Sequence, residues 1–262
     1  MRRGGIGIGA IVLALVAAYF GVDPAVVLDM AQGPASYEQQ SAQPIPPDDA
    51  GAQFVAKVLG ETEDTWQAVF QAQTNGAYQE PRLVLFRGAT PTACGTGQSA
   101  MGPFYCPADS KVYIDLGFFD EMQHKLGASG DFAQAYVIAH EVGHHIQKLM
   151  GTSERFQQAT RQVSQTDANE LSVRMELQAD CYAGVWAHHA QAARQILEPG
   201  DIEEGLRAAS AVGDDALQRK AQGYVVPDSF THGTSAQRAS WFKRGLQSGA
   251  MRDCDTFSAA QL

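Results

Sequence analysis

Residues 140–144 read His-Glu-Val-Gly-His, the pattern with the clearest chemical meaning in this 262-residue chain. Residues i and i+4 of an α-helix project from the same face, so the imidazoles of His140 and His144 converge. Two histidines at this spacing, with a glutamate directly after the first, are typical of a zinc site in which Glu141 is the general base toward a metal-activated water. The pattern predicts metal-assisted hydrolysis. A solvated His/Glu face of a surface helix is the alternative.

A catalytic zinc ion takes three protein ligands and keeps its fourth position for water, so one more ligand is needed. No histidine follows His144 at the spacing of a metzincin. His145 lies about 100° further round the helix, which favours a supporting or core histidine over a substitute ligand. Glu176 and Asp180 are better candidates, because they lie one helical turn apart. One can bind the metal while the other accepts a hydrogen bond from a ligating histidine.

Solvated acids on a helix surface are the alternative for Glu176 and Asp180. The small residues beside them indicate instead a helix that packs closely on another: Ala179, Ala183 and Gly184. Acidic side chains on a packed helix need a partner, which favours a metal or a histidine nearby.

A third polar group occupies residues 231–238, which read Thr-His-Gly-Thr-Ser-Ala-Gln-Arg. Thr234 or Ser235 can cap the amphipathic helix that follows, and this accounts for part of the pattern. His232 and Arg238 could also donate hydrogen bonds to the oxyanion formed when water attacks a carbonyl. A surface histidine and arginine are the alternative.

The elements that must position these residues are mainly helices. Apolar periodicity predicts helices at 117–127, 131–149, 166–194, 201–222 and 235–248. From Phe54 to Phe70 the helical spacing is interrupted at Gly60, which predicts two short helices or one broken helix. Residues 83–86 and 111–116 have strand patterns. The expected fold class is α+β, mainly helical with a small β-sheet.

The N-terminus carries Arg2 and Arg3 and then an uncharged stretch from Gly4 to Val22, just long enough to cross a bilayer as a helix. By the positive-inside rule, the arginines before it and Asp23 after it predict a single-pass membrane protein whose body is periplasmic or extracellular. A cleaved signal peptide and a buried apolar helix are the alternatives. We find no small-x-small cleavage site, which favours an uncleaved transmembrane helix.

Residues 32–47 are rich in Gln, Ser, Ala and Pro, which is typical of an extended linker. We therefore expect a membrane anchor and flank at 1–31, a linker at 32–47 and one folded domain at 48–262. The formal net charge of −10 argues against a nucleic-acid partner, because phosphate contacts need a basic surface.

Four cysteines in an exported chain permit two disulfides with three possible connectivities. We predict Cys94–Cys106, which closes a glycine-rich loop, and Cys181–Cys254, which ties the end of the chain to its middle. Four buried thiols are the alternative.

These motifs together resemble the bacterial family of putative neutral zinc metallopeptidases, which are membrane-anchored and of the gluzincin type. The resemblance rests on four blocks: Cys94 with 99–109 and 112–116; His-Glu-Val-Gly-His-His-Ile-Gln at 140–147; Glu-Leu-Gln-Ala-Asp-Cys-Tyr-Ala-Gly at 176–184; and His-Gly-Thr-Ser-Ala-Gln-Arg at 232–238. It extends from the N-terminal segment to near the C-terminus.

The resemblance implies a zincin-like, gluzincin catalytic domain that hydrolyses peptide or protein substrates. Its implied site consists of Zn²⁺ on His140, His144 and Glu176, with Glu141 as base, Asp180 supporting a ligand, and His232 and Arg238 in catalytic roles. By analogy, the strand from Val112 to Leu116 would pair with an extended substrate. The rival class is a non-catalytic exported binding module with a structural or vestigial zinc site.

Overall fold

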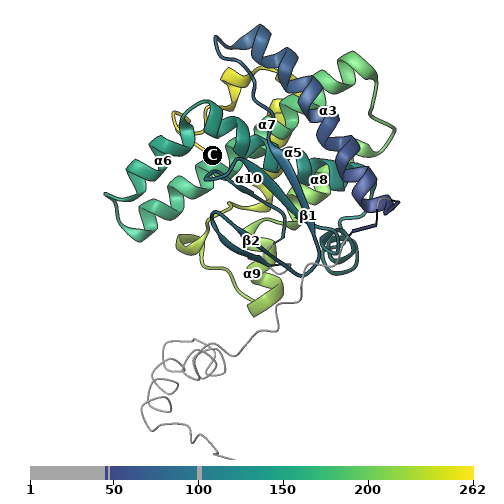
Figure 1. Ribbon diagram of the computed structural model, residues 1–262. Helices are drawn as coiled ribbons and strands as arrows, with labels where there is room; N and C mark the ends of the chain where they lie inside the picture. The colour runs from purple at the N-terminus through teal and green to yellow at the C-terminus, as the bar shows by residue number, and fades with distance from the viewer. Residues whose placement is uncertain (1–44, 47, 99–101) are drawn as a thin grey trace, which may run out of the picture. The chain divides into compact units, whose positions relative to one another are not determined.

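The computed structural model describes residues 45–46, 48–98 and 102–262 (Figure 1). The predicted membrane anchor at 1–31 and most of the predicted linker at 32–47 lie outside these residues, so the domain boundaries stay predictions. No helix within the described residues is both long enough and apolar enough to cross a membrane.

The described part of the chain is mainly helical with a small β-sheet, which confirms the predicted α+β class. The helices are α3 (Ala50–Gln73), α4 (Phe118–Glu121), α5 (Asp131–Leu149), α6 (Thr152–Thr160), α7 (Gln165–Arg194), α8 (Asp201–Ala211), α9 (Asp214–Gln222) and α10 (Ser235–Ser248). The strands are β1 (Arg82–Phe86), β2 (Ala89–Thr92), β3 (Gly95–Gln98), β4 (Phe104–Cys106) and β5 (Lys111–Asp115). A π-helical turn (Met122–Leu126) and two 3₁₀ turns (Pro227–Ser229 and Met251–Cys254) complete the set of described helical elements.

Strands β1, β5 and β4 form a three-stranded sheet in that order, and β2 and β3 form a separate antiparallel hairpin. β5 runs parallel to β1 and antiparallel to β4, and Tyr113 lies opposite Val84 on one side and Phe104 on the other. The expectation that Val112 to Leu116 offers a free edge is therefore wrong. The run of buried residues in β5 reflects a central strand, and the two outer strands are β1 and β4.

Helix α3 packs against β1, α5 and α7 (Figure 1). It is one continuous helix of 24 residues, so the predicted break at Gly60 is wrong. Asp49 caps its first turn by accepting a hydrogen bond from the Ala52 N–H at 2.9 Å. The apolar stripe continues past Gly60 to Trp66, whose ring is fully buried edge-to-face on Tyr182 of α7. This packing outweighs the low helix propensity of one glycine.

The long helix α7 packs along α10 and also against α5. Its contact with α10 brings two backbones together, because a Cβ at Gly184 would overlap the Phe242 carbonyl oxygen and a Cβ at Gly245 would overlap that of Cys181. The small residues of α7 thus allow the close packing that the sequence predicts.

We expect Gly245→Ala to lower the free energy of unfolding by about 1–3 kcal/mol, because the added methyl group overpacks this contact. The measurement is urea unfolding followed by circular dichroism. Gly60→Ala is the matched control, since a Cβ there meets nothing within 4 Å. It should stabilise the protein by about 0.4–1 kcal/mol. A Gly245→Ala variant as stable as the native protein would contradict the close packing of α7 on α10.

Other boundaries differ from those predicted. The helix expected at 201–222 is two helices, α8 and α9, because the chain turns at Val212 and Gly213. The helix expected at 117–127 is the short α4 and a π-helical turn. Helix α6 lacks an apolar stripe, and β2, β3 and β4 are only three or four residues long, so periodicity did not reveal them.

Both predicted disulfides, Cys94–Cys106 and Cys181–Cys254, are confirmed. The first joins the β2–β3 turn to the outer strand β4. The second joins α7 to the turn at Met251–Cys254, across 73 residues of sequence. Cys181 directly follows Asp180, so this bridge braces the part of α7 that carries the acidic residues.

Candidate metal centre and cleft

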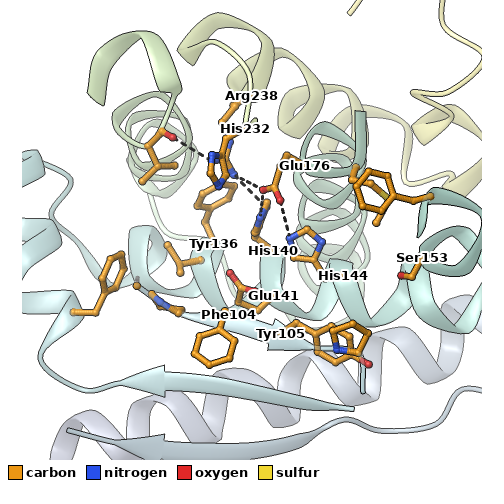
Figure 2. Close-up of a pocket in the computed structure, with 18 of the residues that line it drawn as sticks. Phe104, Tyr105, Tyr136, His140, Glu141, His144, Ser153, Glu176, His232 and Arg238 are labelled. Atoms are coloured by element: carbon orange, nitrogen blue, oxygen red, sulfur yellow. Dashed lines mark hydrogen bonds and ion pairs between the residues drawn. The ribbon is translucent and has the colours of Figure 1, made fainter. Parts of the chain in front are cut away.

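The three side chains predicted as metal ligands converge in the structure (Figure 2). Nε2 of His140 lies 3.1 Å from Oε2 of Glu176, and Nε2 of His144 lies 3.4 Å from Oε1 of the same carboxylate. Zinc–nitrogen and zinc–oxygen bonds of about 2.0–2.2 Å place tetrahedral neighbours about 3.4 Å apart. The spacing of these atoms therefore fits one small cation.

Close packing of α5 on α7 brings the ligands together. A Cβ at Gly143 would lie 2.8 Å from the carbonyl oxygen of Ala179, so only glycine fits between His140 and His144 at this point. Glu176 lies about one turn before Ala179 on α7 and therefore faces both histidines.

Asp180 orients the first histidine. Its Oδ1 lies 2.8 Å from Nδ1 of His140, and it also accepts hydrogen bonds from the Tyr136 hydroxyl at 2.5 Å and from Nη2 of Arg238 at 2.9 Å. The other oxygen, Oδ2, accepts a hydrogen bond from Nε of Arg238 at 2.8 Å. Because the carboxylate takes the Nδ1–H of His140, Nε2 is the ring atom that faces Glu176 and is left to bind a metal in place of a proton.

Gln147 orients the second histidine. Its side-chain NH₂ donates to the Met175 carbonyl oxygen at 2.7 Å and to Gln178 Oε1 at 3.2 Å. Its own Oε1, at 2.8 Å from Nδ1 of His144, must therefore accept from that nitrogen. His144 carries its hydrogen on Nδ1, which leaves the Nε2 lone pair for a metal.

The charges in the cluster favour a cation. Burial disfavours the charged form of Asp180, but Arg238 and His140 hold its pKa at about 2. For Glu176 burial likewise opposes ionisation, yet His144 and His140 hold its pKa well below the ordinary range. Burial lowers the pKa of His140, and Asp180 and Glu176 outweigh this and raise it to about 10. The ionised Glu176 carboxylate and the two imidazoles form a donor set that suits a divalent ion such as zinc.

Glu141 is buried beside the ligands and lines the cavity that opens onto them. Burial raises the pKa of its carboxyl, while His140 and His144 partly oppose that shift. A raised pKa makes the carboxylate a stronger base, which suits a group that takes a proton from water.

His232 reaches the cleft from the loop before α10 and lies beside Arg238 and Glu176 (Figure 2). Its Nδ1 lies 3.2 Å from Oδ1 of Asp214, and this contact raises the pKa of His232. Oδ2 of Asp214 accepts the backbone N–H groups of residues 231–233 and so holds the loop.

Arg238 also borders the cleft, but its side chain is only 4% exposed. Nε and Nη2 both donate to Asp180, and Nη1 lies 3.3 Å from the Val212 carbonyl oxygen. These contacts favour a positioning role for Arg238, in which it acts on His140 through Asp180, over the predicted role as an oxyanion donor.

Three residues of the site were not predicted from the sequence: Tyr136, Gln147 and Asp214. Tyr136 and Gln147 could have been found, because they lie four residues before His140 and three after His144 on one helix. Asp214 has no local signal, because it meets His232 through the turn between α8 and α9.

A cavity of about 540 Å³ opens onto the ligands. Its lining includes β4 and the residues before it, one face of α5, part of α6, and Val212 and Leu217 near the α8–α9 turn. The outer strand β4 therefore borders the cleft.

One protein family and several relatives match most of this chain. The family model described as "Putative neutral zinc metallopeptidase" matches residues 1–257. The chain is 55% identical over 252 residues to the uncharacterized protein YpfJ of Escherichia coli strain K12, covering 96% of this chain and 86% of that protein. It is 44% identical over 219 residues to an uncharacterized protein of Mycobacterium tuberculosis strain H37Rv, covering 80% of this chain and 73% of that protein. No solved structure gives a significant match.

Proposed function

Since this chain belongs to the family of putative neutral zinc metallopeptidases, we propose that it is a zinc-dependent peptidase that hydrolyses peptide bonds at His140, His144 and Glu176. The observation that carries the proposal is the convergence of these three side chains, with Glu141 beside them on the same cleft. The glutamate as third ligand supports assignment to the gluzincin type.

A zinc ion at this site would lower the pKa of a coordinated water and polarise the scissile carbonyl. Glu141 takes the proton of the attacking water and later passes it to the leaving amine. His232 is held by Asp214 through Nδ1, and this contact favours the protonated ring, which presents its Nε2–H to the carbonyl oxygen as negative charge develops there. Arg238 and Asp180 keep the Nε2 lone pair of His140 directed at the ligand position.

The substrate would bind as an extended chain along β4. This outer strand pairs with β5 on one edge, and Phe104 and Tyr105 line the cleft. Addition of a peptide strand to a sheet edge supplies backbone hydrogen bonds without requiring a particular sequence. The edge proposed for substrate pairing is therefore that of Phe104–Cys106.

We also propose that residues 1–31 anchor the protein in the cell membrane and that residues 48–262 act in the periplasm or outside the cell. The charge pattern around Gly4 to Val22 supports this topology. The two disulfides also support it, because such bonds persist in oxidising compartments.

Metal analysis tests the proposed function. We expect the purified protein to contain one zinc ion per chain and Glu176→Ala to lose most of it, because two imidazoles alone hold zinc weakly. Glu170→Ala is the matched control, since Glu170 lies on the same helix with 62% of its side chain exposed, and its zinc content should stay native. A native protein that binds no zinc after reconstitution would instead favour the non-catalytic binding module.

A further inference from the structure

We infer that the cleft binds the interior of an extended, uncharged polypeptide segment, and that the protein is an endopeptidase rather than an enzyme that removes residues from a chain end. This inference rests on the proposed peptidase function and adds the class of substrate.

An exopeptidase must hold a charged chain end, so it needs a free cation for a terminal carboxylate or a free carboxylate for a terminal amine. Among the described lining residues the acidic and basic side chains are His140, Glu141, His144, Glu176, His232 and Arg238. Each of these six side chains either has a proposed role in the reaction or is bound by another residue of the protein.

The cationic candidate for binding a carboxyl terminus is Arg238, and it is engaged. Asp180 accepts from Nε at 2.8 Å and from Nη2 at 2.9 Å. Moving the guanidinium toward a substrate would take one of two cationic partners from the fully buried Asp180, which is energetically costly. His232 is likewise held by Asp214 at 3.2 Å.

The anionic candidates for binding an amino terminus are Glu141 and Glu176. Glu176 lies between the two histidines as a ligand. Glu141 cannot act as base toward water while it forms an ion pair with a terminal ammonium group. The described lining therefore offers no carboxylate dedicated to a chain end.

The rest of the described lining is neutral and largely apolar. It includes Phe104, Phe118, Val137, Phe156, Val212 and Leu217. A neutral lining accepts uncharged side chains and disfavours burial of charged ones.

The cleft also has room on both sides of the reacting bond. Figure 2 shows Tyr136 and Ser153 on opposite sides of His140 and His144. Lining residues continue past the ligands toward the start of α5 and, in the other direction, onto α6. A substrate can therefore place residues before and after the scissile bond in the cleft.

The test compares four versions of one uncharged, apolar decapeptide: free at both ends, N-acetylated, C-amidated, and capped at both ends. Each is incubated with the full-length, zinc-loaded protein and with its Glu141→Gln variant, and products are identified by mass spectrometry. We expect one internal cut in all four, with kcat/KM varying by no more than about twofold, because exposed charges contribute little.

If a chain end were bound by a charged group, capping that end would lower kcat/KM by about tenfold or more. That loss, or release of terminal residues only, would overturn the endopeptidase inference and leave the peptidase function standing. No cleavage of any version beyond the Glu141→Gln background would instead overturn the peptidase function, and this inference with it.

Discussion

Replacing Glu141 by glutamine is expected to lower the rate of peptide hydrolysis by about 10²–10⁴-fold while zinc stays bound. The amide keeps the size of the side chain but cannot accept the proton of the attacking water. The ligands His140, His144 and Glu176 are unchanged, so metal content should match that of the native protein. The measurement is kcat/KM on an internally cleaved peptide, with zinc determined on the same sample.

Glu154→Gln is the matched control, because Glu154 is an exposed glutamate on α6 and is not among the described residues that line the cavity. Its rate should stay close to native. A Glu141→Gln enzyme with native kcat/KM would rule out Glu141 as the general base. Loss of zinc in that variant would mean that Glu141 supports the metal site instead.

Replacing Arg238 by methionine is expected to lower the free energy of unfolding by about 3–5 kcal/mol. The variant removes both hydrogen bonds from the guanidinium to Asp180, whose side chain is fully buried. The buried carboxylate then keeps only His140 as a positively charged neighbour, and it is far less stable than with both. The measurement is urea unfolding of the zinc-free protein, and Arg252→Met, at a position 89% exposed, should change stability by less than about 0.5 kcal/mol.

The loss of unfolding free energy in Arg238→Met should depend on pH. In the native protein the pKa of Asp180 is about 2, below its unfolded value, so ionised Asp180 adds stability that is lost only as the pH falls toward 2. Without Arg238 the folded pKa rises, and the buried carboxylate can accept a proton at mildly acidic pH. The difference between Arg238→Met and the native protein should therefore be largest near neutrality and should narrow in acid. A loss of unfolding free energy that is the same at every pH would show that the loss comes from packing instead.

Much of the site could be predicted because its signals are local. His140, Glu141 and His144 lie within one turn and a half of helix, and helical geometry alone brings them together. Glu176 and Asp180 are again one turn apart, and the small residues of α7 indicate close packing. The relation between the two helices, however, depends on the contact at Gly143 and Ala179, which no periodicity specifies.

The features that sequence patterns missed depend on tertiary contacts. Asp214 reaches His232 only because the chain turns at Gly213, where helical periodicity predicts a continuous helix. The alternating pattern at 111–116 identifies a strand but not its neighbours, so the outer position of β4 could not be seen. Gly60 interrupts the pattern of α3 without interrupting the helix, because burial of residues on both sides of it stabilises the helix.

The disulfide between Cys181 and Cys254 makes a covalent ring of the chain between these residues. Asp214, His232 and Arg238 lie inside the ring, and Glu176 and Asp180 lie just before it. A single break in the backbone within residues 182–253, for instance at the turn after α7 or the one after α9, would therefore leave every proposed site residue on one covalently joined molecule. The half of the site contributed by α10 and its preceding loop is thus retained even in a nicked chain, for as long as this one bond stays oxidised.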